Sequence, residues 1–284
     1  MIKLALGTVQ FGLPYGINNQ FGVPEDGELS NIFSLAKEAG IDVLDSAQGY
    51  GNAEERIGKL SKNEFHVITK FKKLESPLPF HLELKESLRK LKSDSVYGYM
   101  AHDGDLLIGN PAWWDSLKKA KELGLVKKIG YSLYSVNQLE SLLAKQMIPD
   151  LIQFPYNVLD RRFESYLSHL ASLGVEIHTR SVYLQGLLHM DPNQIPIYVR
   201  ALHPYLIQVR EIVNKYDVSL SQVCLGFCIQ NPFINKVVIG VDNVFQLTEN
   251  IDLCKKESLT EETMNELLSI EVKDKNLLNP ANWK

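Results

Sequence analysis

Cysteine, basic charge and long apolar runs are all scarce in this sequence. Its 284 residues include only three cysteines, Cys224, Cys228 and Cys254. A small, odd number of cysteines excludes a disulfide framework and fits a reducing cytoplasm. The first two are four residues apart, so they share a helix face with apolar neighbours. We expect buried free thiols there rather than a metal site.

The charge balance and the apolar pattern exclude two classes of partner. Thirty Lys and Arg residues against 34 Asp and Glu residues give a formal net charge of −4, so no basic field favours nucleic acid. No apolar run approaches the roughly 20 residues that cross a bilayer. The N-terminus also lacks the apolar segment of a signal peptide. We therefore expect a cytoplasmic protein without a nucleic-acid or membrane partner.

Short β-type runs alternate with helical periodicity along the whole chain. Eight strands, each followed by a helix, within about 250 residues are typical of a closed (β/α)8 TIM barrel. We predict an α/β fold of that kind, with parallel strands and a single domain over residues 1–284. The expected strands are Lys3–Leu6, Asp42–Asp45, His66–Lys70, Val96–Ala101, Val126–Tyr131, Leu151–Phe154, Val175–Arg180 and Lys236–Ile239.

The segments between the strands have the 3.6-residue periodicity of helices. Several end in the glycine expected just beyond a helix C-terminus, namely Gly40, Gly124 and Gly174. A doubly wound open sheet alternates in the same way, but no strand here is followed at once by a G-x-G-x-x-G turn. The stretch from Leu184 to about Ser219 follows the seventh strand. It is either a loop that shapes the substrate site or an irregular surface loop.

Ionisable residues stand at the ends of three consecutive strands. Asp45 ends the second strand, and Tyr50 follows between two glycines. Lys70 ends the third strand and His102 the fourth. Because the carboxyl ends of barrel strands meet on one face, these side chains should lie together. Each alone could be a cap, a packed ring, a strand end or a satisfied histidine, but four at matching strand ends favour an active site.

The combination of phenol, ammonium, carboxylate and imidazole has a definite chemistry. A free tyrosine, with a pKa of about 10, is a poor proton donor unless its phenolate is stabilised. A neighbouring ammonium provides that stabilisation, and a carboxylate holds the ammonium in place. An imidazole can hydrogen-bond the same carbonyl oxygen. Such a site protonates an oxygen that is becoming an alkoxide, the half-reaction complementary to hydride delivery.

A family resemblance rests on seven segments that recur in one order: "GTVQFG", "DSAQGYGNAEERIG", "VITKF", "MAHDGD", "IGYSLYS", "LIQFPYNVLDRR" and "VVIGVDNVFQL". The chain resembles a short bacterial-type member of the aldo-keto reductase superfamily from Leu4 to about Ile270. The resemblance implies reduction of an aldehyde or ketone to an alcohol. In that reading Tyr50 is the general acid, Lys70 tunes it, Asp45 holds Lys70, and His102 orients the carbonyl.

The resemblance also assigns a nicotinamide cofactor, with NADP(H) as the first expectation and NAD(H) as the alternative. The implied contacts run from the nicotinamide ribose (Gly7, Thr8) and carboxamide (Ser132, Gln153) through the pyrophosphate (Ser181, Leu184, Gly186) to the adenosine (Gly240, Gln246, Asn250). The last group follows a strand and a glycine turn at the start of a helix, where backbone N–H groups can meet phosphate.

Three departures from the family pattern bear on the cofactor. Leu133 follows Ser132 where the family usually has asparagine. Arg180 stands where many members stack an aromatic ring on the nicotinamide, and arginine can stack there or bind an anion. The segment 240–250 has no Lys or Arg for a 2′-phosphate and contains Asp242, which keeps NAD(H) open. Lys236 would reach that phosphate only if its strand end frayed.

The two ends of the chain raise structural questions. The N-terminal β-hairpin common in the family is absent, so Met1 and Ile2 are the expected cover for the barrel floor. At the other end, Trp283 either folds over the pocket rim or docks on the outside of the barrel.

The substrate is indicated only in outline. Gln10 and Phe11 are the expected substrate contacts, and Tyr15 and Asn19 lie in the same loop. An aromatic wall with amides suits a sugar-like carbonyl, although core packing explains Phe11 equally well.

Two other functional classes compete with a reductase. A cofactor-binding sensor of the same fold would show little turnover. A metal-dependent hydrolase would use His102, Asp103 and Asp105, but alternation along a strand lets at most two of them share a face. We expect no metal.

Overall fold

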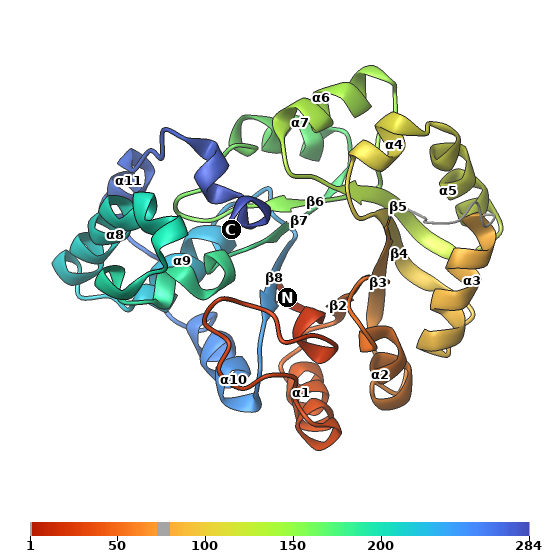
Figure 1. The fold of residues 1–284 in the computed structure, drawn as a ribbon, viewed down its shortest axis with the longest axis horizontal. Helices are drawn as coiled ribbons and strands as arrows, with labels where there is room; N and C mark the ends of the chain where they lie inside the picture. The colour runs from red at the N-terminus through yellow and green to blue at the C-terminus, as the bar shows by residue number, and fades with distance from the viewer. Residues whose placement is uncertain (1, 73–79, 284) are drawn as a thin grey trace.

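Eight parallel strands close into a barrel with helices around its outside (Figure 1). The computed structural model describes residues 2–72 and 80–283. Each strand pairs with the next along the chain, and β8 pairs with β1. The predicted barrel is confirmed, and every strand boundary lies within one residue of its expected position. The strands are β1 (Leu4–Gly7), β2 (Val43–Asp45), β3 (His66–Phe71), β4 (Val96–Ala101), β5 (Val126–Ser132), β6 (Leu151–Pro155), β7 (Glu176–Arg180) and β8 (Lys236–Gly240).

The helices follow the predicted periodic segments, and α8, α9 and α11 gather on one side of the barrel (Figure 1). The α-helices are α1 (Asp26–Glu38), α2 (Ala53–Leu60), α3 (Phe80–Leu91), α4 (Asp105–Gly109), α5 (Ala112–Glu122), α6 (Val136–Ala144), α7 (Leu167–Ser172), α8 (His203–Lys215), α9 (Leu220–Ile229), α10 (Val244–Leu253) and α11 (Glu261–Ser269). The 3-10 helices are Val9–Phe11, Glu164–Tyr166, Leu184–His189, Pro192–Gln194, Ile197–Leu202, Lys275–Leu278 and Pro280–Asn282.

Glycines follow three of these helices as predicted. Gly40 follows α1 with φ of 77°, Gly124 follows α5 with φ of 73°, and Gly174 follows α7 with φ of 76°. An L-residue with a side chain rarely adopts this left-handed conformation, so glycine allows the chain to reverse toward the next strand. Each following strand therefore starts at the barrel floor and delivers its carboxyl end to the opposite face.

The inner face of the strands is layered, and this layering positions the site. The middle layer is an apolar cluster of Ala5, Val43, Ile68, Met100, Leu151 and Val238. Inner-face positions recur every second residue along a strand. Two residues beyond members of this layer come Asp45, Lys70 and His102. Their side chains therefore lie above the apolar layer, at the carboxyl ends of β2, β3 and β4.

A polar cluster fills the opposite end of the barrel, the floor. The Tyr97 hydroxyl donates to Glu176 Oε2 at 2.7 Å, Lys128 pairs with the same carboxylate, and His178 Nε2 lies 2.6 Å from Glu176 Oε1. Hydrogen bonds from His178, Lys128 and Tyr97 outweigh burial and hold the pKa of Glu176 below its usual range. These groups close the floor by charge pairing.

Lys236 belongs to the floor and not to the cofactor end. Its ammonium pairs with Asp42 and donates to the Ile2 carbonyl at 3.3 Å. The idea that it reaches a 2′-phosphate is therefore wrong, because β8 is ordered from Lys236 onward and carries that side chain to the opposite end. Ile2 packs against the main hydrophobic core, Met1 lies outside the described residues, and their role as cover for the barrel floor stays a prediction.

Cys224 and Cys228 are fully buried free thiols on α9. The stretch after β7 begins in the pocket wall and then packs into the core through Val199 and Leu202. The Trp283 indole N–H donates to the Leu277 carbonyl at 2.9 Å, and the ring packs on the core outside the pocket. Within the described ranges, no helix has both the length and the apolar character to cross a bilayer.

Candidate active site

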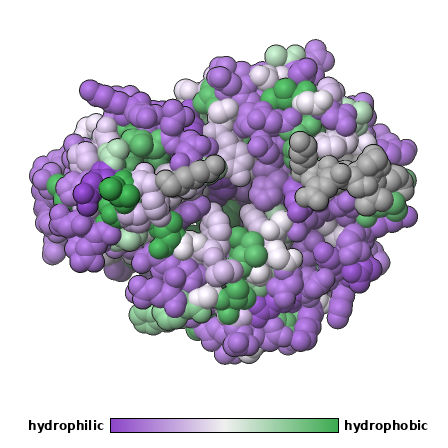
Figure 2. Space-filling view, viewed as in Figure 1, coloured by the Kyte–Doolittle hydropathy of each residue, from purple (hydrophilic) through white to green (hydrophobic). Residues whose placement is uncertain are grey.

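A cavity of about 520 Å³ opens at the carboxyl ends of the strands. Figure 2, drawn from the same side as Figure 1, shows a largely hydrophilic surface that is hollowed near its centre. Asp45, Tyr50 and His102 line the cavity, and Lys70 lies directly behind them. The structure thus brings together the four side chains that the strand ends predict. Their catalytic roles stay predictions.

Lys70 and Asp45 form an ion pair that is almost completely buried. Lys70 Nζ lies 2.7 Å from Asp45 Oδ2 and donates to the Ser46 carbonyl at 3.0 Å. The other oxygen of Asp45 accepts from Gln153 Nε2 at 2.8 Å. Burial lowers the pKa of Lys70, and the Asp45 carboxylate works against that shift. The pair fixes the ammonium 5.6 Å from the centre of the Tyr50 ring.

Tyr50 and His102 face each other edge to face, with ring centroids 5.6 Å apart. Burial, assisted by Asp45, raises the pKa of Tyr50 well above its usual value. Lys70 was expected to lower the Tyr50 pKa, but its charge is largely matched by Asp45 and burial dominates. Burial and the charges of Lys70 and Arg180 lower the pKa of His102 to about 4. At neutral pH the site therefore presents a neutral phenol beside a neutral imidazole.

The depressed His102 pKa predicts a pH-dependent loss of stability. The unfolded histidine binds a proton below about pH 6.5, whereas the folded one stays neutral down to about pH 4. The unfolded state therefore takes up more protons in this window, and stability falls as pH falls. Between pH 7 and pH 4.5 we expect wild type to lose about 2 to 3 kcal/mol more than His102→Gln, measured by urea unfolding. Parallel curves for the two proteins would show that His102 does not titrate abnormally.

A strained loop after β7 forms the next part of the cavity wall. Ser181, Leu184, Gln185 and Gly186 all have positive φ, between 48° and 91°. Only glycine adopts this conformation at no cost, so the loop is held by its surroundings. The backbone N–H groups of Leu184 and Gly186 donate to the Ser181 and Tyr183 carbonyls at 3.0 and 2.9 Å, so the loop is closed by its own turns. Ser181 and Gly186 line the cavity.

Gln10 and Gly240 meet where β1 and β8 end. A side chain at Gly240 would clash with the Gln10 amide, so glycine lets that amide lie against the strand end. Gln10 Oε1 is buried and has no hydrogen-bond partner among the described residues. Gly7 and Thr8 line the same wall. The unpaired Gln10 oxygen and the glycine backbone at this wall fit a polar, elongated ligand such as a dinucleotide.

The far end of the cavity carries two carboxylates and engaged amides. Asp242 and Glu249 line it. The Gln246 amide is bound to Asp242 at both of its ends, donating from Nε2 at 3.3 Å and accepting from the backbone N–H at 2.8 Å. Asn250 Oδ1 accepts from the Tyr183 hydroxyl at 2.6 Å. This end is acidic, and a second phosphate on the ribose would meet like charge there.

Two of the expected contacts do not face the cavity. Phe11, expected beside Gln10 at the substrate, is fully buried and packs edge to face on Phe33. Leu184, expected at the pyrophosphate, is also fully buried, and its neighbour Gln185 lines the cavity instead. The other expected cofactor positions, Gly7, Thr8, Ser132, Gln153, Arg180, Ser181, Gly186, Gly240, Gln246 and Asn250, all line it.

Sequence reasoning missed Tyr134, Tyr183 and Glu249 in the lining. Tyr134 lies two residues after Ser132, the end of a barrel strand, and that position was the available signal. Glu249 lies on α10 three residues after Gln246, so the helical period was its available signal, whereas Tyr183 lies in a loop without a regular period.

A metal site of the kind weighed for His102, Asp103 and Asp105 has no support in the geometry. Asp103 Oδ1 accepts from Gln138 Nε2 at 2.6 Å and from the Asp105 backbone N–H at 3.0 Å. Across the residues that the structure describes, no three His, Cys, Asp or Glu side chains converge as ligands would.

Comparisons with known proteins extend over almost the whole chain. The Aldo/keto reductase family profile matches residues 3–272. An uncharacterized oxidoreductase of Bacillus subtilis is 25% identical, over 95% of this chain and 96% of its own. A D-threo-aldose 1-dehydrogenase of Pseudomonas is 25% identical, over 89% of this chain and 92% of its own. The solved holo form of an aldo-keto reductase from Bacillus halodurans superposes with a TM-score of 0.76 at 21% identity, covering 94% of this chain and 91% of its own.

Proposed function

The chain belongs to the aldo/keto reductase family of oxidoreductases, and on that premise we propose that it reduces an aldehyde or ketone to an alcohol with a nicotinamide cofactor. The observation that carries the proposal is the position of the buried Lys70–Asp45 pair behind Tyr50 and His102 at the inner end of the cavity. The cavity volume suits a dinucleotide with a small carbonyl compound beside it.

The cofactor, when bound, supplies the hydride that reduces the carbonyl carbon. Tyr50 donates its phenolic proton to the carbonyl oxygen as negative charge develops there. The ammonium of Lys70 stabilises the resulting phenolate, and Asp45 holds that ammonium in position. His102, neutral at pH 7, hydrogen-bonds the same oxygen without adding charge.

The substrate side of the cavity is polar, which supports a hydroxylated, sugar-like carbonyl compound. Tyr15, which acts electrostatically on Tyr50, accepts from Gln185 Nε2 at 2.6 Å through its hydroxyl. Asn19 Nδ2, by contrast, donates to Asp242 at 3.1 Å at the far end. Amides can both donate to and accept from sugar hydroxyls.

For the cofactor we propose that NADH binds more tightly than NADPH. The family resemblance makes NADP(H) the first expectation, but Asp242 and Glu249 line the far end of the cavity. The only Lys or Arg side chain in the described lining is Arg180, near Tyr50 and His102. A ribose 2′-phosphate would therefore meet two carboxylates and no cation.

Fluorescence titration of the protein with NADH and with NADPH tests the proposed function and the preference together. We expect NADH to bind at least about tenfold more tightly, which corresponds to about 1.4 kcal/mol of like-charge repulsion. Asp242→Asn should improve NADPH binding more than NADH binding. Asp252→Asn is the matched control, since Asp252 is also on α10 but pairs with Lys255 outside the cavity.

Each other outcome has a definite meaning. Tighter binding of NADPH would overturn the proposed preference and leave the reductase. Cofactor binding without consumption of NADH in the presence of diverse carbonyls would favour a regulatory, sensor-like protein. If neither cofactor binds, the reductase proposal fails.

A further inference from the structure

Arg180 brings a positive charge to the catalytic end of the cavity. It is the last residue of β7, two residues after His178, which is buried inside the barrel. It therefore shares the inner face of the strand. Burial has the largest effect on both catalytic rings: it raises the pKa of Tyr50 and lowers the pKa of His102. The charge of Arg180 lowers both pKa values. The guanidinium thus acts at the reacting end.

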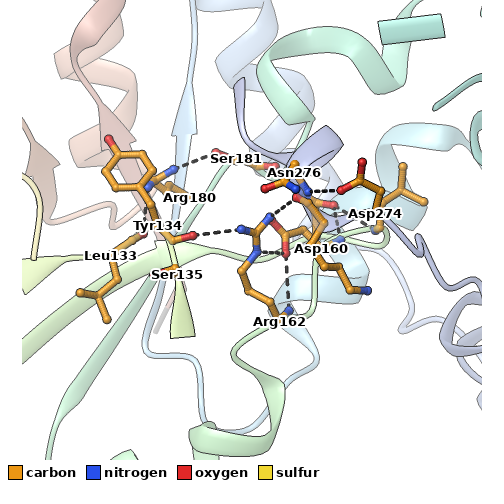
Figure 3. Close-up of polar contacts among 12 residues, drawn as sticks. Leu133, Tyr134, Ser135, Asp160, Arg162, Arg180, Ser181, Asp274 and Asn276 are labelled. Carbon is orange, nitrogen blue, oxygen red and sulfur yellow. Dashed lines mark hydrogen bonds and ion pairs between the residues drawn. The ribbon is translucent and has the colours of Figure 1, made fainter. Parts of the chain in front are cut away.

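The guanidinium is held in a fixed position (Figure 3). Its central carbon lies 4.5 Å from the centre of the Tyr134 ring, in a cation–π contact. Nη2 donates to the Leu133 carbonyl at 3.1 Å, and Nη1 donates to Ser181 Oγ at 3.4 Å. Tyr134 covers one face of the group, and the other N–H donors remain for a ligand.

The backbone of Tyr134 is fixed by hydrogen bonds through both its N–H group and its carbonyl. Its backbone N–H donates to Gln138 Oε1 at 2.8 Å. Its carbonyl accepts from Arg162 Nη1 at 2.9 Å, and Arg162 is paired with the fully buried Asp160 (Figure 3). Arg162 also donates to the Lys275 carbonyl at 3.1 Å. The position of Arg180 is thus fixed by the segments that follow β5 and β6 and by the C-terminal segment.

Among the described residues the Arg180 charge has no directly paired counter-charge, and the buried Asp160 carboxylate on which it acts is already paired with Arg162. Within residues 2–72 and 80–283 no carboxylate lies at ion-pair distance from it, whereas Lys70 is paired with Asp45 and Arg162 with Asp160. A partly buried cation that gives up water without gaining an anion is costly. A rigid site that nevertheless keeps such a cation is suited to a ligand that brings the anion.

The cofactor phosphates are a poor candidate for that anion. The positive-φ loop starts beyond Arg180, at Ser181, and its Tyr183 hydroxyl donates to Asn250 Oδ1 at 2.6 Å, in the part of the cavity assigned to the adenosine. For Asp242, at that far end, the influences on the pKa are burial and the Gln246 hydrogen bond, not Arg180. Arg180 acts on Tyr50 and His102, where the carbonyl compound lies.

Resting on the proposed reductase function, we propose that Arg180 selects carbonyl substrates that carry an anionic group, a carboxylate or a phosphate, a few bonds from the reacting carbon. Its planar fork matches the paired oxygens of such groups. An aromatic residue at this position would stack on the cofactor and would not distinguish anionic from neutral substrates.

Matched substrate pairs test this selectivity. The carboxylate pair is 4-carboxybenzaldehyde and its neutral methyl ester, and the phosphate pair is glyceraldehyde 3-phosphate and glyceraldehyde. With saturating cofactor, we expect wild type to prefer the anionic member of one pair by about 10- to 100-fold in kcat/KM, the size of a charge-assisted hydrogen bond. The pair that shows the preference identifies the anion. In Arg180→Gln the ratio should fall toward one, and Arg180→Lys should keep part of it.

Arg200→Gln is the control for charge alone. Arg200 is exposed on the 3-10 helix Ile197–Leu202 and lies outside the cavity lining, so removing it should leave the ratio unchanged. Equal use of both members by wild type overturns the inference, as does a preference that survives in Arg180→Gln. Weaker cofactor binding by Arg180→Gln with an unchanged ratio would also overturn it, because the residue would then serve the cofactor.

A binding measurement separates this inference from the reductase proposal. Calorimetric titration of the complex with oxidised cofactor gives Kd values for both members of each pair without turnover. A Kd ratio that depends on Arg180 supports the anion site even if no aldehyde is reduced, and that result would overturn only the proposed reaction. Turnover of both members with equal Kd values would overturn only the anion site.

Discussion

Tyr50→Phe is expected to lose about 10²- to 10⁴-fold in kcat/KM for carbonyl reduction while binding the cofactor normally, because that is the usual contribution of a positioned proton donor. The substitution removes one oxygen atom and keeps the ring. The contacts of that ring with His102 and with the Lys70 ammonium therefore remain. Stopped-flow measurement of cofactor oxidation, with a fluorescence titration of cofactor binding, separates the two effects.

Tyr97→Phe is the matched control for the loss of a phenolic hydroxyl. Tyr97 donates to Glu176 at the barrel floor, at the opposite end from the site, so this variant should keep wild-type turnover. If Tyr50→Phe also turned over at the wild-type rate, His102 or water would have to be the proton donor. The midpoint of thermal unfolding of each variant shows whether a loss of turnover comes from a loss of the fold.

The barrel and the meeting of Asp45, Lys70 and His102 could be predicted from the sequence. Buried parallel strands are short apolar runs, and the first polar residue after each run marks its carboxyl end. Parity along the strand then places that residue on the inner face. Both rules are local, so they hold without knowledge of what packs against the strand.

The loop contacts could not be predicted in the same way. Gln10 and Phe11 share a single turn of 3-10 helix, where adjacent side chains point in different directions and no repeat shows which one faces the cavity. Leu184 and Gln185 both have positive φ, which a sequence does not signal for residues other than glycine. Leu184 consequently turns into the core, and Gln185 faces the cavity.

The setting of Arg180 depends on contacts between distant segments. The sequence predicts its place at the end of β7. Because an arginine departs from the family pattern there, the sequence leaves open whether it stacks on the cofactor or binds an anion. Its contact with Tyr134 was not predictable, because Arg162 and Gln138 fix that loop through residues far along the chain. That contact occupies one face of the guanidinium and favours the anion.

Lys70→Met is expected to cost about 3 to 5 kcal/mol of unfolding free energy, because it leaves the Asp45 carboxylate buried without its partner. For a chain of this length the midpoint of thermal unfolding should fall by about 5 to 8 °C. The methionine side chain matches the lysine stem in length, so packing changes little. Urea unfolding at pH 7 measures the loss.

A double-mutant cycle identifies the cause of that loss. Lys70→Met with Asp45→Asn removes both charges, so the double variant should be more stable than the sum of the two single losses predicts. Lys236→Met provides a second comparison, because its partner Asp42 has a side chain that is 42% exposed and stays solvated after the lysine is removed. That variant should lose about 1 kcal/mol or less. Equal losses of unfolding free energy in Lys70→Met and Lys236→Met would show that burial of the Asp45 charge does not cause the loss. The ion pair would then not fix the ammonium that is proposed to stabilise the Tyr50 phenolate.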